Sequence, residues 1–161
     1  MREDFLEAMS RAANSVYVVT TDGPGGRAGV TVSAVTSVSA DAPTMLVCVH
    51  HLSPAAAAIA TNNAFCINLL AEGQAGISDA FAGLTGAKGE EKFDCAEWAE
   101  AVTGAPVLQG ALAAFDCSLV HSLRVGSHHI FIGEIKAVDL SDERSALVHS
   151  NRAYSRAEPL E

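Results

Sequence analysis

The sequence predicts a mainly β chain whose strands form an antiparallel, closed, barrel-like sheet with a few short helices. Three observations lead to this fold class. Six segments are rich in β-branched and other apolar residues, turn residues separate them, and the connections between them are short. The pattern G-x-G-x-x-G and a Walker-type phosphate loop are both absent. A doubly wound parallel sheet is therefore disfavoured.

Length and charge narrow the class of protein. A chain of 161 residues fits one domain of ordinary size, so we expect a single domain over residues 1–161. The formal net charge is −9 and the chain has only ten Lys and Arg residues. A surface that binds nucleic acid or an anionic membrane needs clustered basic side chains, so neither is expected as a partner.

The cysteines and the N-terminal residues indicate the compartment. Cys48, Cys66, Cys95 and Cys117 are widely spaced and form no C-x-x-C pair, which is typical of reduced thiols. The chain opens with charged residues, Arg2 to Asp4, where a signal peptide needs an apolar stretch. We therefore expect the protein in a reducing cytoplasm.

The first half of the chain begins with a helix. Apolar residues at spacings of three and four between residues 2 and 13 predict a surface helix packed on a sheet. A strand over 15–20 and a turn over 22–26 follow. Residues 29–39 then alternate valine with small residues, which predicts one long strand with a packing face and a face that can receive something flat.

An uncharged stretch from Ala42 to Ala71 follows. Pro54 and paired histidines and asparagines interrupt it, so it indicates strand, helix and strand rather than a membrane span. We expect strands over 45–49 and 65–70, and between them a helix with Ser53 as N-cap and Pro54 at its first position.

The second half is less regular at first. A short helix is expected over 76–81, and residues 83–100 predict a long loop anchored by Phe93 and Trp98. Two long strands over 111–124 and 129–140, joined at Gly126-Ser127, follow, and the length of the first indicates a bend. Residues 146–156 form a polar ending that can lie across a neighbour.

Two segments suit a ligand with a flat ring and a phosphate. The small-residue face of Thr31–Ala34 can receive the ring, and the helix start at Ser53 presents free N–H groups that can hold the phosphate without a cationic side chain. Taken alone, an ordinary alternating strand and an ordinary N-cap also explain both segments, since capping serines are common.

Two histidine pairs are the other candidates. Adjacent strand residues point to opposite faces, so His50-His51 and His128-His129 can each offer one metal ligand per face, and surface histidines are the simpler interpretation. One neutral imidazole next to Gly126 can instead stack on or hydrogen-bond an aromatic cofactor. No G-x-S-x-G is present, so a hydrolase is disfavoured, whereas hydride transfer needs no triad because the cofactors carry the chemistry.

From Phe5 to Tyr154, the chain resembles the short flavin reductases with a split-barrel fold, the reductase components of two-component flavin-dependent monooxygenases. The resemblance is carried by residues 29–39, Pro43–Val49, Phe65–Leu70, 126–134 and the Tyr154 region. It implies an FMN-binding split barrel, a bound FMN or FAD, NADH or NADPH as co-substrate, and a homodimer with the flavin near the subunit boundary.

The resemblance also implies site residues. His128 would lie near the nicotinamide as the catalytic residue, and the expected flavin-binding positions are Thr31, Val32, Ser33, Ala34, Ser37, Val49, His50, Ser53, Lys92, Phe93, His128 and Tyr154. In two places the chain departs from the family pattern. Ser127 stands where the family often has Asp, and residues 50–53 replace a segment that commonly carries Asp and Arg or Lys.

The expected function is an NAD(P)H:flavin oxidoreductase that supplies reduced flavin to a partner monooxygenase. A flavin-binding or flavin-sensing module without turnover is the alternative, and a haem or metal binder that uses His50 or His128 is a third class. The choice between FMN and FAD, and between NADH and NADPH, stays open.

Overall fold

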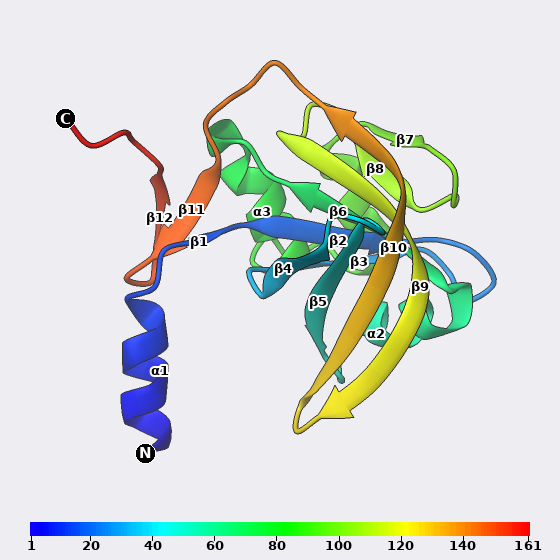
Figure 1. Ribbon diagram of the computed structural model, residues 1–161, viewed down its shortest axis with the longest axis horizontal. Helices are drawn as coiled ribbons and strands as arrows, with labels where there is room; N and C mark the ends of the chain where they lie inside the picture. The colour runs from blue at the N-terminus through cyan, green and yellow to red at the C-terminus, as the bar shows by residue number, and fades with distance from the viewer.

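An antiparallel sheet of seven strands forms the body of the molecule in the computed structural model, which describes residues 1–161 (Figure 1). The strand order is β3-β2-β6-β9-β10-β5-β4. In chain order the strands are β2 (Tyr17–Thr21), β3 (Ala28–Val32), β4 (Val35–Ser39), β5 (Thr44–His50), β6 (Ala64–Leu69), β9 (Ala113–Val125) and β10 (His128–Leu140). The mainly β, antiparallel prediction is confirmed.

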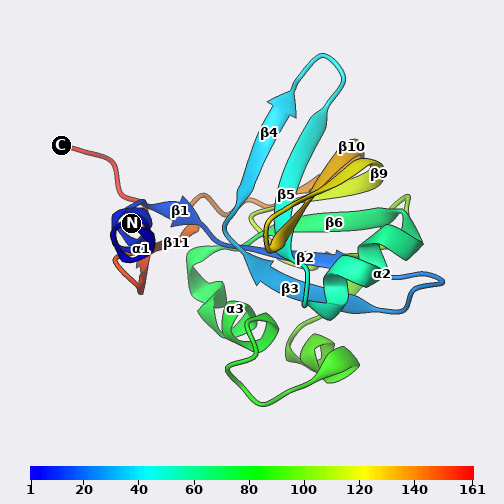
Figure 2. The ribbon, with the colours of Figure 1, turned by 90° about the horizontal axis from the view of Figure 1, so that it is seen from below.

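The two edge strands of this sheet are consecutive in the chain. In a flat sheet of seven strands the edges would lie roughly 29 Å apart, at about 4.8 Å per strand. Only Ser33 and Ala34 connect β3 to β4, and three Cα steps span at most about 11 Å. The sheet must therefore curl until its edges meet at this connection, as Figure 2 shows.

The expected closed barrel is not confirmed. β3 pairs only with β2, and β4 pairs only with β5, so the hydrogen-bonded ladder has a gap between its two edge strands. The chain leaves one edge at Val32 and joins the other at Val35, and it makes no ladder bonds between β3 and β4.

The single strand expected over residues 29–39 is also wrong. Val30 and Val32 lie two residues apart, but the next valine, Val35, lies three residues further on. In an unbroken strand that spacing would turn Val35 to the opposite face. The break at Ser33–Ala34 instead lets Val32 and Val35 pack against the same core.

The core fills the inside of the curled sheet. Val19, Val47, Phe65 and Phe131 are fully buried there. β2 is buried on both faces, because its neighbour Val18 packs on the outer side in a second cluster. This explains the continuous apolar run of β2.

Gly133 of β10 lies deep in this core. A Cβ atom at this position would come within 2.6 Å of Phe65 Cζ and 2.7 Å of Cys117 Cβ. The pairing of β9 with β10 is irregular between Ile132 and Gly133 and again between Ile135 and Ala137. These bulges account for the bend expected in the long hairpin.

Strand, helix and strand follow one another between residues 42 and 71, as predicted. Helix α2 (Pro54–Asn62) begins after Ser53, whose hydroxyl accepts a hydrogen bond from the Ala55 N–H at 3.4 Å. It ends at Asn63, which adopts a left-handed conformation with φ 54°. No helix of the structure has the length and apolar character needed to cross a membrane.

The region expected to be a long loop contains more structure than its sequence indicated. The expected short helix is present as α3 (Ala75–Phe81), after the short turn η1 (Glu72–Gln74). Within the expected loop lie the 3-10 helix η2 (Gly89–Cys95) and strand β7 (Trp98–Glu100), which pairs with β8 (Pro106–Leu108). The two expected anchors are confirmed. Phe93 is 4% exposed, and the Trp98 indole donates to its carbonyl oxygen at 2.9 Å.

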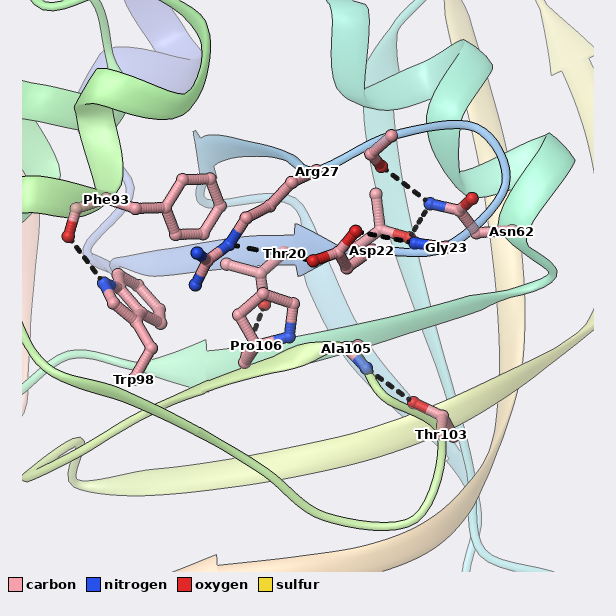
Figure 3. Close-up of polar contacts among 12 residues, drawn as sticks. Thr20, Asp22, Gly23, Arg27, Asn62, Phe93, Trp98, Thr103, Ala105 and Pro106 are labelled. Atoms are coloured by element: carbon pink, nitrogen blue, oxygen red, sulfur yellow. Dashed lines mark hydrogen bonds and ion pairs between the residues drawn. The ribbon is translucent and has the colours of Figure 1, made fainter.

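The same aromatic cluster holds a cation. The Arg27 guanidinium lies 4.3 Å from the centre of the Phe93 ring, and Arg27 Nε lies 3.9 Å from Asp22 Oδ2 (Figure 3). Nearby, Thr20 of β2 donates its hydroxyl to the Pro106 carbonyl at 2.5 Å and so ties β8 to the sheet. These contacts hold the η2 segment against the body of the molecule.

The N-terminal helix does not pack on a sheet, contrary to expectation. Helix α1 (Arg2–Ser10) stands away from the body beside a small sheet of β1 (Asn14–Ser15), β11 (Leu147–Ser150) and β12 (Ala153–Arg156) (Figure 1). No residue of α1 is buried, and Phe5, Leu6 and Met9 are 61%, 45% and 50% exposed. Periodicity identified the apolar stripe correctly but could not show what covers it.

We predict that Gly133→Ala destabilises the fold by about 1–3 kcal/mol, because the new methyl overlaps Phe65 and Cys117. Urea unfolding measures this difference. Gly76→Ala is the matched control, since Gly76 lies in α3 and a methyl group added there would meet no atom within 4 Å. Alanine at that position is neutral or stabilising by up to about 1 kcal/mol. Equal stability of the two variants would contradict the packing described for Gly133.

Candidate functional site

Two hollows lie on either side of the segment 82–84, which follows α3. We call the first the ring hollow; it has a volume of about 270 Å³ and is lined by Val16, Thr31, Val32, Ser33, Ser78, Ala82, Leu84, His149 and Tyr154. We call the second the phosphate hollow; it has a volume of about 330 Å³ and is lined by Pro54, Gly83, Gly86, Ala87, Lys88, Gly89 and Lys92. Because Ala82 and Leu84 line the first and Gly83 lines the second, the hollows are neighbours.

The ring hollow lies beside the gap in the sheet. Thr31 of β3 donates its hydroxyl to the Ser78 carbonyl at 2.7 Å, which joins the edge strand to α3. Small and aliphatic side chains form most of its wall, with hydroxyl groups at its margin. This combination suits a planar heteroaromatic ring that has one polar edge.

Tyr154 of β12 closes one side of the ring hollow. Its hydroxyl donates to Asp79 Oδ1 at 2.7 Å and lies 2.8 Å from Ser78 Oγ. Burial raises the pKa of Tyr154; the hydrogen bond with Ser78 opposes this shift, and the adjacent Asp79 carboxylate adds to it. The phenol therefore stays protonated at neutral pH and holds β12 against α3.

The phosphate hollow combines three features that attract an anion. Pro54 is the first residue of α2, whose helix dipole favours negative charge at this end. Lys88 and Lys92 supply two cations. Gly83, Gly86 and Gly89 have φ of +80°, +85° and +55° and face open space, so their backbone can approach a ligand closely. Lys92 was among the expected flavin-binding residues, and the structure adds Lys88 beside it.

The structure brings some of the expected flavin-binding residues together. Thr31, Val32, Ser33 and Tyr154 line the ring hollow, and Lys92 lines the phosphate hollow next to the helix that Ser53 caps. Ala34 lies beside the ring hollow in the β3–β4 connection, and its carbonyl accepts the Cys48 N–H at 2.9 Å.

Other expected residues lie elsewhere. Val49 and Phe93 are 0% and 4% exposed in the core, because strand alternation turns Val49 inward and Phe93 packs between Phe81 and Trp98. Their side chains line neither hollow. Ser37 is exposed on β4, further along the edge strand.

His50 and His128 also lie outside both hollows. The ladder of β5 and β10 sets them opposite each other, with ring centres 5.1 Å apart. Ser127 Oγ lies 3.0 Å from His128 Nδ1, so the serine that stands in place of the family aspartate still reaches this imidazole. Both rings are exposed, where β5 ends and β10 begins, just before the turn that leads into α2.

Several lining residues were missed by the sequence analysis. Gly83, Gly86 and Gly89 recur every three residues and are followed by Lys92, a glycine-rich pattern that could have indicated a phosphate cradle. His149, whose ring meets Tyr154 edge-on with centres 5.8 Å apart, gave no local signal, because only the pairing of β11 with β12 brings it there.

Together the fold and the two hollows define a nucleotide-binding protein of the split-barrel class, in which a curled antiparallel sheet replaces the doubly wound fold. The chain belongs to the flavin reductase like domain family, whose pattern it matches over residues 9–158. The resemblance noted from the sequence is confirmed.

Similar proteins carry related names. The FMN reductase (NADH) RutF of Stutzerimonas stutzeri is 44% identical over 154 residues, which cover 96% of this chain and 87% of that protein. BorF, the flavin reductase component of a bacterial two-component tryptophan halogenase, is 30% identical with a TM-score of 0.88, covering 99% of this chain and 100% of that chain. The NADH:FAD oxidoreductase SgcE6 of Streptomyces globisporus, solved with NAD and FAD fragments, is 26% identical with a TM-score of 0.88. The match covers 98% of this chain and 93% of that chain.

Proposed function

We propose that this chain is an NADH:flavin oxidoreductase that reduces FMN or FAD and releases the reduced flavin to a partner monooxygenase. The observation that carries the proposal is the pair of neighbouring hollows, one suited to a flat ring and one to a phosphate. The names of the relatives support the choice of reaction and of NADH as the donor. BorF, as the flavin reductase component of a two-component tryptophan halogenase, supports a separate partner enzyme.

In this proposal each wall of the ring hollow has a task. Thr31, Ser33 and the neighbouring backbone to Ala34 meet the polar edge of the isoalloxazine ring, and Ser37 extends this edge along β4. Val32 and Leu84 exclude water from the ring. Tyr154, held by Asp79, covers the open side.

The phosphate is held on the other side of segment 82–84. Ser53 and the first N–H groups of α2 bind it from one wall, and Lys88 and Lys92 neutralise it from the opposite wall. Val49 and Phe93 support the site from within the core. A bound flavin supplies the ring that accepts a hydride. The protein positions this ring, excludes water from it and neutralises the phosphate.

His128 and His50 complete the proposal. We assign His128 to the nicotinamide side of the site, with Ser127 fixing its ring by the contact to Nδ1. His50 lies opposite it and stabilises its position from β5. One domain over residues 1–161 would carry the whole site, in a cytoplasm where its four free cysteines stay reduced.

The direct test is NADH oxidation with and without added FMN or FAD. We expect flavin-dependent turnover, and we expect His128→Ala to lower kcat more than it weakens flavin binding. A protein that binds flavin but leaves it oxidised when NADH is added would be a sensor and would contradict the reductase proposal. NADPH in place of NADH shows which donor is preferred.

A second prediction concerns the phosphate hollow. Removing both charges in Lys88→Gln/Lys92→Gln raises the Kd for FMN by about tenfold or more, because a charge-assisted phosphate contact contributes about 1.4 kcal/mol or more. Fluorescence quenching of FMN measures this change. Riboflavin, which lacks the phosphate, is the ligand control, and Lys136→Gln, whose lysine pairs with Glu134 elsewhere, is the protein control. An unchanged Kd for FMN would show that Lys88 and Lys92 do not bind the phosphate.

We also propose that the chain forms a homodimer, with α1 as an arm that a second copy covers. The apolar stripe of α1 finds no cover within its own chain, and an exposed apolar stripe of this kind marks a surface that a partner covers. The arm is attached to the body by the Glu7–Arg152 ion pair at 2.9 Å and by the Asn151 N–H, which donates to the Ser10 carbonyl.

Light scattering during size exclusion tests the dimer. We expect twice the chain mass of 16.6 kDa for the unaltered protein, and a shift to the single mass for Phe5→Glu/Met9→Glu. Ala8→Glu, which adds one charge to α1 off the stripe, keeps the double mass. A single mass for the unaltered protein would refute the dimer.

A further inference from the structure

His149 of β11 lines the ring hollow, yet the proposed function gives it no task. It is exposed beside Tyr154, whose ring it meets edge-on with centres 5.8 Å apart. His50 and His128 are the histidines whose rings hydrogen-bond within the protein, and no histidine forms an ion pair. The His149 imidazole is therefore free to bind a ligand in the hollow.

The hairpin of β11 and β12 fixes the place of this imidazole. Asn151 and Arg152 form its two-residue turn, and both adopt left-handed conformations, with φ of 50° and 59°. This turn geometry matches the twist of a tight hairpin, and it sets His149 directly opposite Tyr154. A slip of the register by one residue would turn the imidazole to the other face of the small sheet.

Both strands of the hairpin are tied to the body of the molecule. In β11 the Leu147 N–H donates to the Leu70 carbonyl at 3.0 Å, and in β12 the Tyr154 hydroxyl donates to Asp79 of α3 at 2.7 Å. His149 lies between these two attachments along the chain. It therefore faces the ring hollow from a fixed position.

Most hydroxyl protons around the ring hollow are already used within the protein. Thr31 donates its hydroxyl to the Ser78 carbonyl at 2.7 Å, and Tyr154 donates to Asp79 Oδ1. The Ser78 hydroxyl lies 2.8 Å from the Tyr154 oxygen. Because the phenol proton points to Asp79, the phenol oxygen accepts the proton of Ser78. These three hydroxyl groups have no proton left for a ligand.

Two donors of the wall remain without a protein acceptor, the Ser33 hydroxyl and the His149 imidazole. Ser33 belongs to the connection between the two edge strands of the large sheet, and His149 belongs to the small sheet. A neutral imidazole carries one N–H in either tautomer, so the His149 donor does not depend on a charged ring. The ring hollow thus has one free donor from each sheet.

The polar edge of an isoalloxazine ring needs such donors. Its carbonyl oxygens and unprotonated ring nitrogens accept hydrogen bonds, whereas only one N–H of the oxidised ring donates. When the ring is reduced, this edge gains negative charge at neutral pH. A hydrogen bond to a charged acceptor is stronger than one to a neutral acceptor. A donor at this edge therefore stabilises the reduced ring more than the oxidised ring.

We propose that the His149 imidazole donates a hydrogen bond to the polar edge of the flavin ring and strengthens the binding of reduced flavin more than that of oxidised flavin. The inference rests on the proposed function, because it takes the ring hollow as the flavin site. It gives His149 a task distinct from that of Tyr154, whose hydroxyl is occupied by Asp79. Tighter binding of the reduced ring limits its escape into bulk water before a partner enzyme takes it.

The test compares His149→Phe with His149→Gln by calorimetry with riboflavin, which has the ring but no phosphate. Phenylalanine keeps an aromatic ring beside Tyr154 but removes the N–H, whereas glutamine restores an N–H donor. We expect His149→Phe to raise the Kd about fivefold for oxidised riboflavin and about 30-fold for reduced riboflavin, measured without oxygen. His149→Gln should stay within about threefold of the unaltered protein for both forms.

Two further measurements separate a hydrogen bond from a general disturbance. The same substitution in His121→Phe, at an exposed histidine of β9 that lines neither hollow, should leave both Kd values unchanged. The visible absorption bands of bound oxidised riboflavin respond to hydrogen bonds at the polar edge of the ring. These bands should shift in His149→Phe and return to their original positions in His149→Gln.

The inference is overturned if His149→Phe binds both forms like the unaltered protein. It is also overturned if His149→Gln loses as much affinity as His149→Phe, since His149 would then act only by packing on Tyr154. An equal loss for oxidised and reduced riboflavin would contradict the preference for the reduced ring. Because NADH takes no part in these measurements, a failed reductase assay with the expected binding pattern would reject the proposed function and leave His149 as a flavin ligand.

Discussion

The two-residue connection between β3 and β4 is the constraint on which the rest of the structure depends. It ties together the two edges of a sheet that would otherwise lie far apart, and so forces the sheet to curl around its own core. Because Val32 and Val35 both turn inward, Ser33 and Ala34 are left at the surface, between two edge strands that make no ladder bonds with each other. The ring hollow lies beside that gap. The surface proposed to contact a flavin, Thr31–Ala34, is therefore exposed because β3 and β4 do not pair with each other.

Local charge matters more than total charge in this chain. The net charge of −9 would repel a phosphorylated ligand at long range, yet the phosphate hollow collects two lysines and a helix N-terminus. These groups come from separate segments. Only the folded chain places them around the start of α2, which explains why so few basic residues suffice for a nucleotide site.

The sequence analysis succeeded where the signal is local. Ser53 and Pro54 mark the start of α2 through short-range capping, and the buried anchor Phe93 follows from one aromatic residue in a polar stretch. It failed where the answer depends on a distant partner. The stripe of α1 indicated a packed helix, although nothing in its own chain covers it, and His149 enters the ring hollow only through the pairing of β11 with β12. The break at Ser33 was visible as a shift in the valine spacing, but the near-regular alternation on either side concealed it.

The central claim is that one ligand occupies both hollows, with its ring beside Thr31–Ser33 and its phosphate between the start of α2 and the two lysines. A crystal structure of the protein with FMN tests this most directly. The account predicts phosphate density within hydrogen-bond distance of the Ser53 hydroxyl and the first N–H groups of α2, and the ring against Tyr154 and β3. A flavin bound elsewhere, with both hollows filled by protein side chains, would contradict it.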